Sequence, residues 1–271
     1  MRAKKAAATV LLLTLAVAGC SPDSAESSSL PDVGHIHHIA VDQENILVGA
    51  HYGLFRYTAD SQWQRMGDEF DVMGLSVTPS GIVVSGHPGP GFPFPDPLGL
   101  LASNDGGETW QSVSLTGEVD FHYLTSSGNT LVGFDATNGL MVTSVDGGLT
   151  WEILALPPIS AIALHPDNPS QMVVISDGQG LVSTDGGETF QEFDLPPGTE
   201  TLVWSNTGLL AAAALELHLA PAPGEAFTLL ATFDGVVHTV AASANTIAVA
   251  LHDDRVVASR DGGKTFSVIS D

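Results

Sequence analysis

Ser103-Asn-Asp-Gly-Gly-Glu-Thr-Trp110 is a segment that this chain repeats with few changes. The other copies are Ser144-Val-Asp-Gly-Gly-Leu-Thr-Trp151, Ser183-Thr-Asp-Gly-Gly-Glu-Thr-Phe190 and Ser259-Arg-Asp-Gly-Gly-Lys-Thr-Phe266. We refer to these four segments as the boxes. Self-similarity at a regular spacing indicates one supersecondary unit that is copied along the chain.

The spacing of the closing aromatic residues gives the period of the repeat. It is 41 residues from the first box to the second, 39 to the third, and 76, twice 38, from the third to the fourth. One copy is therefore missing before the last box, and Ala220-Pro-Ala-Pro-Gly-Glu-Ala-Phe227 fills the gap as an eroded copy. Upstream, Arg56-Tyr-Thr-Ala-Asp-Ser-Gln-Trp63 retains little beyond the aromatic residue. The chain therefore contains six units, two of them with eroded boxes.

Each box predicts a tight hairpin between two strands. The aspartate side chain can accept hydrogen bonds from nearby backbone, and the two glycines adopt positive φ without strain. Around the third box, residues 160–164, 172–175, 181–183 and 190–195 are expected to form four short strands separated by glycine and proline turns. The chain is thus predicted to be all-β, a six-bladed β-propeller of four-stranded antiparallel blades over residues 35–271.

The N-terminus has the features of an export signal. Three cations precede an apolar stretch over residues 6–18, which ends in Leu15-Ala-Val-Ala-Gly-Cys20. That ending resembles a bacterial lipobox, which implies that residues 1–19 are removed and that Cys20 is lipidated. The polar residues that follow favour a flexible tether over residues 20–34. We therefore expect an exported protein, lipid-anchored to the outer side of a bacterial cell membrane.

The charge of the chain is strongly acidic. The formal net charge is -23, and without the three cations of residues 1–19 five Lys and Arg remain against 31 Asp and Glu, which gives -26. Such a surface repels phosphate backbones, so nucleic acid is not expected as a partner. Solubility is one explanation of the acidity, and attraction of a divalent metal or a basic protein is another.

The boxes resemble the Asp-box (BNR) repeat of sialidases, sortilin-type ectodomains and photosystem II assembly factors, all of them propellers. With its lipobox, its Gly86-His-Pro88 turn and its Asp120-Phe-His122 segment, the chain resembles uncharacterised exported bacterial Asp-box lipoproteins that are labelled glycosyl hydrolases. The resemblance implies a structural role for the box aspartates Asp105, Asp146, Asp185 and Asp261.

Strand topology predicts where a functional site would lie. The boxes join the third and fourth strands of each blade, so the opposite face is formed by the starts of the first strands and by the second-to-third turns. The candidate ligand-binding residues expected on that face are His37, His38, His51, His87, His122, Asp120 and Asp135. Four of these, His37, His51, His87 and His122, are candidate ligands of a divalent metal. Their spacing is not a known metal motif, and for any single histidine the first interpretation is a hydrogen-bonded turn or channel residue.

Three functions are compatible with these observations. The first is a membrane-tethered module that binds a protein or glycan ligand through the face opposite the boxes, and the second is a transition-metal-binding lipoprotein. The third is a glycoside hydrolase with catalytic carboxylates among Asp71, Asp120 and Asp135. Sialidases hold the substrate carboxylate with three arginines, and no such triad can be assembled here from Arg56, Arg65, Arg255 and Arg260.

Blade two also contains an insertion, residues 88–99, with five prolines. The prolines favour an extended arm. Phe92 and Phe94 of this arm are expected either to contact a partner or cap the central channel, or to pack against the edge of the blade.

Overall fold

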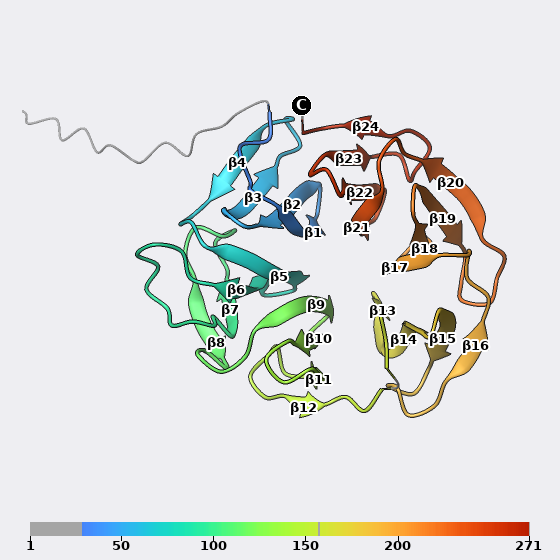
Figure 1. Ribbon diagram of the computed structural model, residues 1–271, viewed down its shortest axis with the longest axis horizontal. Coiled ribbons are helices and arrows are strands. Elements are labelled where there is room, and N and C mark those ends of the chain that lie inside the picture. The colour runs from blue at the N-terminus through green and yellow to red at the C-terminus, as the bar shows by residue number, and fades with distance from the viewer. Residues whose placement is uncertain (1–28, 157, 271) are drawn as a thin grey trace, which may run out of the picture.

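The structure is a computed structural model that describes residues 29–156 and 158–270. The expected signal peptide, Cys20 and most of the tether lie outside these residues. The described part is all-β and forms a ring of six blades around a central axis (Figure 1). No helix in this part is long and apolar enough to cross a membrane.

The first three blades are four-stranded antiparallel sheets with strands in chain order. Blade 1 comprises β1 (Ile36–Asp42), β2 (Asn45–Ala50), β3 (Gly53–Tyr57) and β4 (Trp63–Met66). Blade 2 comprises β5 (Asp71–Thr78), β6 (Gly81–His87), β7 (Leu100–Ser103) and β8 (Gln111–Ser114). Blade 3 comprises β9 (Phe121–Ser127), β10 (Thr130–Asp135), β11 (Leu140–Ser144) and β12 (Glu152–Ile153).

The last three blades have the same topology. Blade 4 comprises β13 (Ala161–His165), β14 (Asn168–Ser176), β15 (Gln179–Ser183) and β16 (Gln191–Phe193). Blade 5 comprises β17 (Thr199–Ser205), β18 (Gly208–Ala213), β19 (Glu216–Ala220) and β20 (Thr228–Thr232). Blade 6 comprises β21 (Val237–Ser243), β22 (Thr246–Leu251), β23 (Val256–Ser259) and β24 (Ser267–Val268). The predicted fold and blade number are confirmed, and Figure 1 shows the first strand of each blade innermost.

Each box forms the predicted hairpin between the third and fourth strands. In blade 2, Ser103 Oγ donates to Asp105 Oδ1 at 2.7 Å and accepts from the backbone N–H of Gly107 at 2.8 Å. The Asp105 carboxylate also accepts from the N–H and hydroxyl of Thr109, at 3.0 and 2.5 Å. Hydrogen bonds of this kind, from the threonine above all, lower the pKa of each box aspartate to about 2. The box carboxylates are therefore occupied within their own hairpins.

The second glycine of a box allows the hairpin to pack onto the preceding blade. Gly148 has φ 91°, and a Cβ at this position would overlap Cδ2 of Leu100 in blade 2. Both the backbone conformation and the close approach exclude a side chain here.

The core consists of apolar side chains packed between adjacent blades, and blades 6 and 1 close the ring in the same way. Ile36, Val48 and Phe55 of blade 1 pack in one cluster with Ala248 and Val256 of blade 6. The buried Trp63 donates its Nε1–H to the carbonyl of Ile269 at 2.7 Å. Both blades are complete in sequence, so no strand is exchanged to close the ring.

The proline-rich arm packs against blade 2. Phe92 stacks on the buried Phe70 at a centroid distance of 4.5 Å, and Phe94 contacts Phe92 at 5.4 Å. Both rings are partly buried against the core of this blade. Of the two predicted alternatives, packing against the blade edge is the one observed.

Candidate metal-binding face

The end of the propeller opposite the boxes is built from three positions that recur in the blades. In blade 1, Ile36 pairs with Ala50, and the residue after Ile36 forms a β-bulge in the first strand. We call this His37 the bulge position, His35 before Ile36 the lead position, and His51 after Ala50 the turn position. The same pairing and bulge recur in blades 2, 3, 5 and 6. A bulge redirects the side chain of its extra residue, so the geometry of this face is a property of the repeat.

The residues at these positions differ between blades, and many of them are histidine or aspartate. The bulge positions are His37, Met73, His122, Glu200 and His238 in blades 1, 2, 3, 5 and 6. The lead positions in the same order are His35, Asp71, Asp120, Gly198 and Val236. The turn positions are His51, His87, Ala136, Ala214 and His252.

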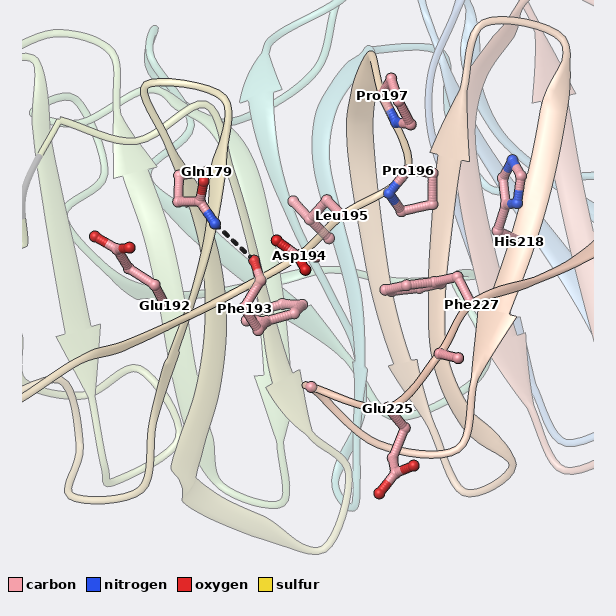
Figure 2. Close-up of a pocket in the computed structure, with 12 residues that line it drawn as sticks. Gln179, Glu192, Phe193, Asp194, Leu195, Pro196, Pro197, His218, Glu225 and Phe227 are labelled. Carbon is pink, nitrogen blue, oxygen red and sulfur yellow. Dashed lines mark hydrogen bonds between the residues drawn. The ribbon is translucent and has the colours of Figure 1, made fainter.

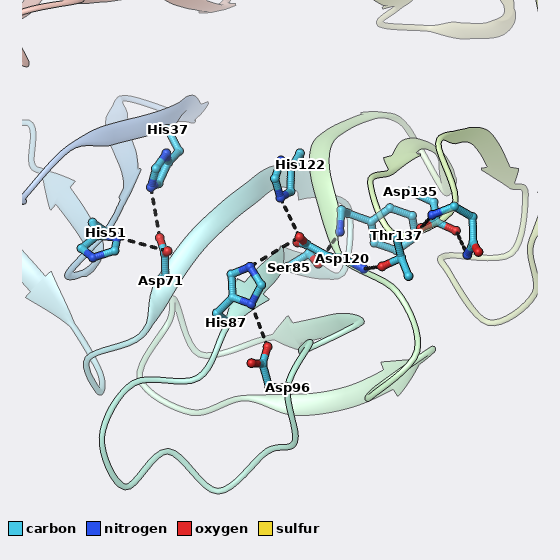
Figure 3. A network of polar contacts seen from close by, with 12 residues as sticks. His37, His51, Asp71, Ser85, His87, Asp96, Asp120, His122, Asp135 and Thr137 are labelled. Carbon is cyan, nitrogen blue, oxygen red and sulfur yellow. Dashed lines mark hydrogen bonds and ion pairs between the residues drawn. The ribbon is translucent and has the colours of Figure 1, made fainter.

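The first group of candidate metal ligands lies at the junction of blades 1 and 2. His37 Nε2 lies 3.1 Å from Asp71 Oδ1, and His51 Nδ1 lies 3.1 Å from Asp71 Oδ2 (Figure 3). We call His37, His51 and Asp71 the first triad. One ligand atom from each residue lies within 4.8 Å of those of the other two.

The second group lies at the junction of blades 2 and 3, and its ligand atoms are equally close to one another. His122 Nε2 lies 2.6 Å from Asp120 Oδ2, and His87 Nε2 lies 3.4 Å from the same oxygen (Figure 3). The other ring nitrogen of His87, Nδ1, contacts Asp96 Oδ1 at 2.7 Å. We call His87, Asp120 and His122 the second triad.

These separations resemble those between ligands of one ion. An ion bound at about 2.0–2.2 Å by nitrogen and oxygen holds neighbouring ligand atoms roughly 2.9–3.5 Å apart in tetrahedral or octahedral geometry. The distances of 3.1, 3.1 and 3.4 Å fall in that range. The 2.6 Å contact of His122 with Asp120 is shorter and is that of a charge-assisted hydrogen bond, whose proton a metal would displace.

Two buried oxygens of these carboxylates lack a hydrogen bond. Asp71 Oδ1 is inaccessible to solvent, and its contact with His37 Nε2 does not have hydrogen-bond geometry. Asp120 Oδ1 is likewise buried without a hydrogen-bond partner. Unpaired buried oxygens are costly, and a cation would satisfy them.

Electrostatic interactions couple the two triads. Burial works against ionisation of Asp71, but the contact with His37 and the charges of His37, His51 and His87 outweigh it and lower the pKa of Asp71. Burial also opposes protonation of His87, but the hydrogen bond to Asp96 and the charges of Asp120, Asp96 and Asp71 raise the pKa of His87 overall. Asp71 is therefore anionic at neutral pH, as metal binding requires.

Two residues expected at the site lie apart from the triads. Asp135 is buried at the end of β10, where its two oxygens accept hydrogen bonds from the backbone and side chain of Asn138, so Figure 3 shows it beside Thr137 and away from the histidines. His38 lines the central channel, a cavity of about 190 Å³, and its ring contacts that of Tyr123 at 5.4 Å. Burial, with nearby His238 and His37, lowers the pKa of His38 to about 4.

The four arginines in the described part of the chain do not assemble into a carboxylate-binding group. Arg255 is paired with Asp234 and Asp253, and Arg65 with Glu69. Arg56 donates to Gln64 and Arg260 to the carbonyl of Glu44. Since Asp71 and Asp120 are engaged by histidines as well, the arrangement does not favour a sialidase-type reaction.

A larger concavity of about 930 Å³ lies elsewhere, between the outer parts of blades 4 and 5. Its acidic side chains, Glu192, Asp194 and Glu225, point in different directions (Figure 2). Gln179 is held by a 2.8 Å hydrogen bond from its Nε2 to the carbonyl of Phe193. This groove therefore does not bring metal ligands together.

Sequence reasoning missed two features of the site. Asp96 lies in the proline-rich arm, and only the folding of the arm over blade 2 brings it to His87. The division of the histidines into two groups also escaped prediction, because it depends on which lead-position aspartate each histidine contacts. His37, His51 and His87 contact the aspartate of the next blade, and His122 contacts that of its own blade. The repeated bulges, had they been predicted, would have identified the aligned positions.

Comparison with known proteins shows the fold alone. No known protein-family profile and no curated protein matches the chain. A structure of YCF48 bound to D1 peptide covers 90% of this chain and 83% of its own, with TM-score 0.54 and 17% identity. YCF48 from Cyanidioschyzon merolae covers 91% and 89%, with TM-score 0.55 and 14% identity. A gluconolactonase from Xanthomonas campestris covers 83% and 86%, with TM-score 0.63 and 11% identity. At such identities a shared propeller says nothing about activity, and the resemblance to Asp-box lipoproteins stays a prediction.

Proposed function

We propose that this chain is an exported, lipid-anchored propeller that binds divalent transition-metal ions on the face opposite its boxes. The observation that supports this most directly is the pair of triads, each with two imidazoles and one carboxylate converging from adjacent blades. Two histidines and a carboxylate form a ligand set suited to zinc, iron(II), cobalt, nickel or copper. Three protein ligands leave coordination positions open for water or a further ligand.

Several properties of the chain support this proposal. Both triads combine the turn position of one blade with the lead position of the next, His51 with Asp71 and His87 with Asp120. Their third residue comes from a bulge position, that of blade 1 in the first triad and that of blade 3 in the second. The net charge of -23 attracts divalent cations to the surface. An anchor at Cys20 would keep the propeller at the outer membrane surface, where it would meet metal ions arriving from outside the cell.

The metal content of the purified full chain in detergent tests the proposal. After loading with zinc and removal of loose ions, the zinc bound per chain is measured by elemental analysis. His37→Ala with His51→Ala should lose one zinc ion relative to the wild type, and His87→Ala with His122→Ala should lose another. Far-ultraviolet circular dichroism should stay unchanged in both double variants.

The matched control is His165→Ala with His218→Ala, two histidines of blades 4 and 5 outside the triads. This variant should retain the full zinc content. If neither triad variant loses zinc, or if the control loses as much, the triads are not the binding sites and the proposal is wrong.

The anchor needs a separate test. Wild-type protein expressed in a bacterium should partition into the detergent phase of a phase-separation assay, and Cys20→Ala should remain in the aqueous phase. Equal partitioning of the two proteins would contradict lipidation at Cys20.

A further inference from the structure

The blade 6 to blade 1 junction repeats the positions that form the first triad. The first triad takes the bulge and turn residues of blade 1 and the lead residue of blade 2, namely His37, His51 and Asp71. One blade earlier, the bulge and turn residues of blade 6 and the lead residue of blade 1 are His238, His252 and His35. The backbone N–H of His252 donates to the carbonyl of Val236 at 2.9 Å, and the backbone N–H of His51 donates in the same way to the carbonyl of His35. The two turn positions are therefore equivalent.

The ring of His238 lies close to the rings of the other two residues. The ring of His238 lies 4.7 Å from that of His252 and 5.6 Å from that of His35, centroid to centroid. Imidazoles that share one ion, with nitrogens about 2.1 Å from it, have centroids roughly 4.5–5.2 Å apart. The 4.7 Å distance falls in that range and the 5.6 Å distance lies above it, and both are shorter than the 6.3 Å between the rings of His37 and His51 in the first triad.

Two further observations favour a ligand at this junction. Asp254 Oδ1 lies 2.9 Å from His35 Nδ1 and also accepts the N–H of Ile36 at 2.8 Å, so the carboxylate is fixed and leaves Nε2 of His35 for coordination. A carboxylate on the second nitrogen is the usual partner of a metal-bound histidine. In addition, Nε2 of His238 is inaccessible to solvent and has no hydrogen-bond partner.

We propose that His35, His238 and His252 form a third metal site, an all-nitrogen site for a divalent ion such as zinc or copper, oriented by Asp254. The inference rests on the proposed metal-binding function. The nitrogens of this group do not all lie as close together as those of the two triads, so a rotation of the His35 or His252 ring accompanies binding. Three imidazoles carry no negative charge, so this site should prefer softer ions than the two triads do.

The remaining junctions lack such sets at the aligned positions. Blade 3 has Ala136 at its turn position, and blade 5 has Ala214 there, followed by Val236 at the lead position of blade 6. Blade 5 has Gly198 at its lead position. Metal-binding side chains thus occupy three consecutive junctions, and this continuity distinguishes them from histidines scattered by chance.

The test uses the full chain with both triads removed by His37→Ala, His51→Ala, His87→Ala and His122→Ala. Calorimetric titration with zinc chloride should show one remaining ion per chain. Adding His252→Ala, a change at an exposed side chain, should abolish that binding, and adding His238→Ala should do the same. Adding His218→Ala instead should leave it unchanged. Circular dichroism checks that each variant is folded.

The outcomes separate this inference from the proposed function. If the wild type binds zinc and the four-histidine variant binds none, the third site is absent while the triads stand. A remaining ion that survives both His238→Ala and His252→Ala would have other ligands, and this also overturns the inference. If the wild type itself binds no zinc, the proposed function fails and the third site fails with it.

Discussion

His87 Nδ1 lies 2.7 Å from Asp96 Oδ1, and this contact determines which nitrogen of His87 faces the second triad. An ionised carboxylate can only accept a hydrogen bond, so Nδ1 bears a proton and donates it. Nε2 is left facing Asp120 Oδ2 at 3.4 Å. Two acceptors repel each other at this distance unless a proton or a metal ion lies between them. Asp96 thus prepares His87 to bind either one.

Removing the charge of Asp96 should weaken metal binding without touching a ligand. Asp96→Asn is expected to lower the zinc affinity of the second triad by about 10- to 100-fold, as for other partners of metal-bound histidines. Calorimetric titration measures this affinity in a protein that also carries His37→Ala, His51→Ala and His252→Ala, so that only the second triad remains. Asp177→Asn is the matched control, since Asp177 is an exposed acid at the blade 4 turn. Equal affinities in the two variants would show that Asp96 has no such role.

Zinc binding to the second triad should weaken as the pH falls. The raised pKa of His87 means that its proton is held to a higher pH than in a free histidine, and the protonated ring cannot coordinate. Below that pKa the affinity should fall about tenfold per pH unit. In Asp96→Asn the pKa of His87 drops, so the decline should begin at a lower pH. Dissociation constants measured across the titration range of histidine test this, and a flat profile would contradict it.

The sequence predicted the fold because the boxes determine it locally. An aspartate, two glycines and a threonine specify one hairpin conformation, and the spacing of the four boxes, with two eroded copies, predicts six blades. The face that holds His37, His51, His87 and His122 followed from strand topology. The grouping of these histidines did not follow, because the triads join residues of different blades. Asp135 was wrongly expected among the ligands, because both of its carboxylate oxygens accept hydrogen bonds from Asn138.

The two glycines of one box should differ in their tolerance of a side chain. Gly147 has φ 78°, and no atom lies within 4 Å of the place where a Cβ would be, so Gly147→Ala meets only backbone strain of about 1–2 kcal/mol. Gly148→Ala would add a clash with the buried Leu100 and should cost about 1–3 kcal/mol more. Urea unfolding measures both. Equal losses would mean that the hairpin does not press on the preceding blade.

Closure of the ring should depend on the hydrogen bond of Trp63. Trp63→Phe leaves the carbonyl of Ile269 without its donor and is expected to cost about 1–3 kcal/mol of unfolding free energy. Trp110→Phe is the matched control, because Nε1 of Trp110 is buried without a hydrogen-bond partner. The control should be clearly less destabilising in urea unfolding. If the control destabilises the protein as much, the loss of stability comes from the smaller volume of the phenyl side chain and not from the lost hydrogen bond to the C-terminal segment.

The box aspartates should make the stability of the protein depend on pH in the acidic range. The pKa of Asp146 is lowered from 3.8 to about 2, first by the hydrogen bonds from the backbone and hydroxyl of Thr150. A depressed folded-state pKa gives stability that is complete above 3.8 and is lost as the pH falls through about 2. The melting temperature of Asp146→Asn should therefore lie below that of the wild type at neutral pH, and the gap should narrow between about pH 4 and 2. Asp194→Asn, at an exposed carboxylate outside the boxes, should show no such convergence. A gap for Asp146→Asn that stays constant down to the lowest pH would mean that Asp146 does not contribute through its charge.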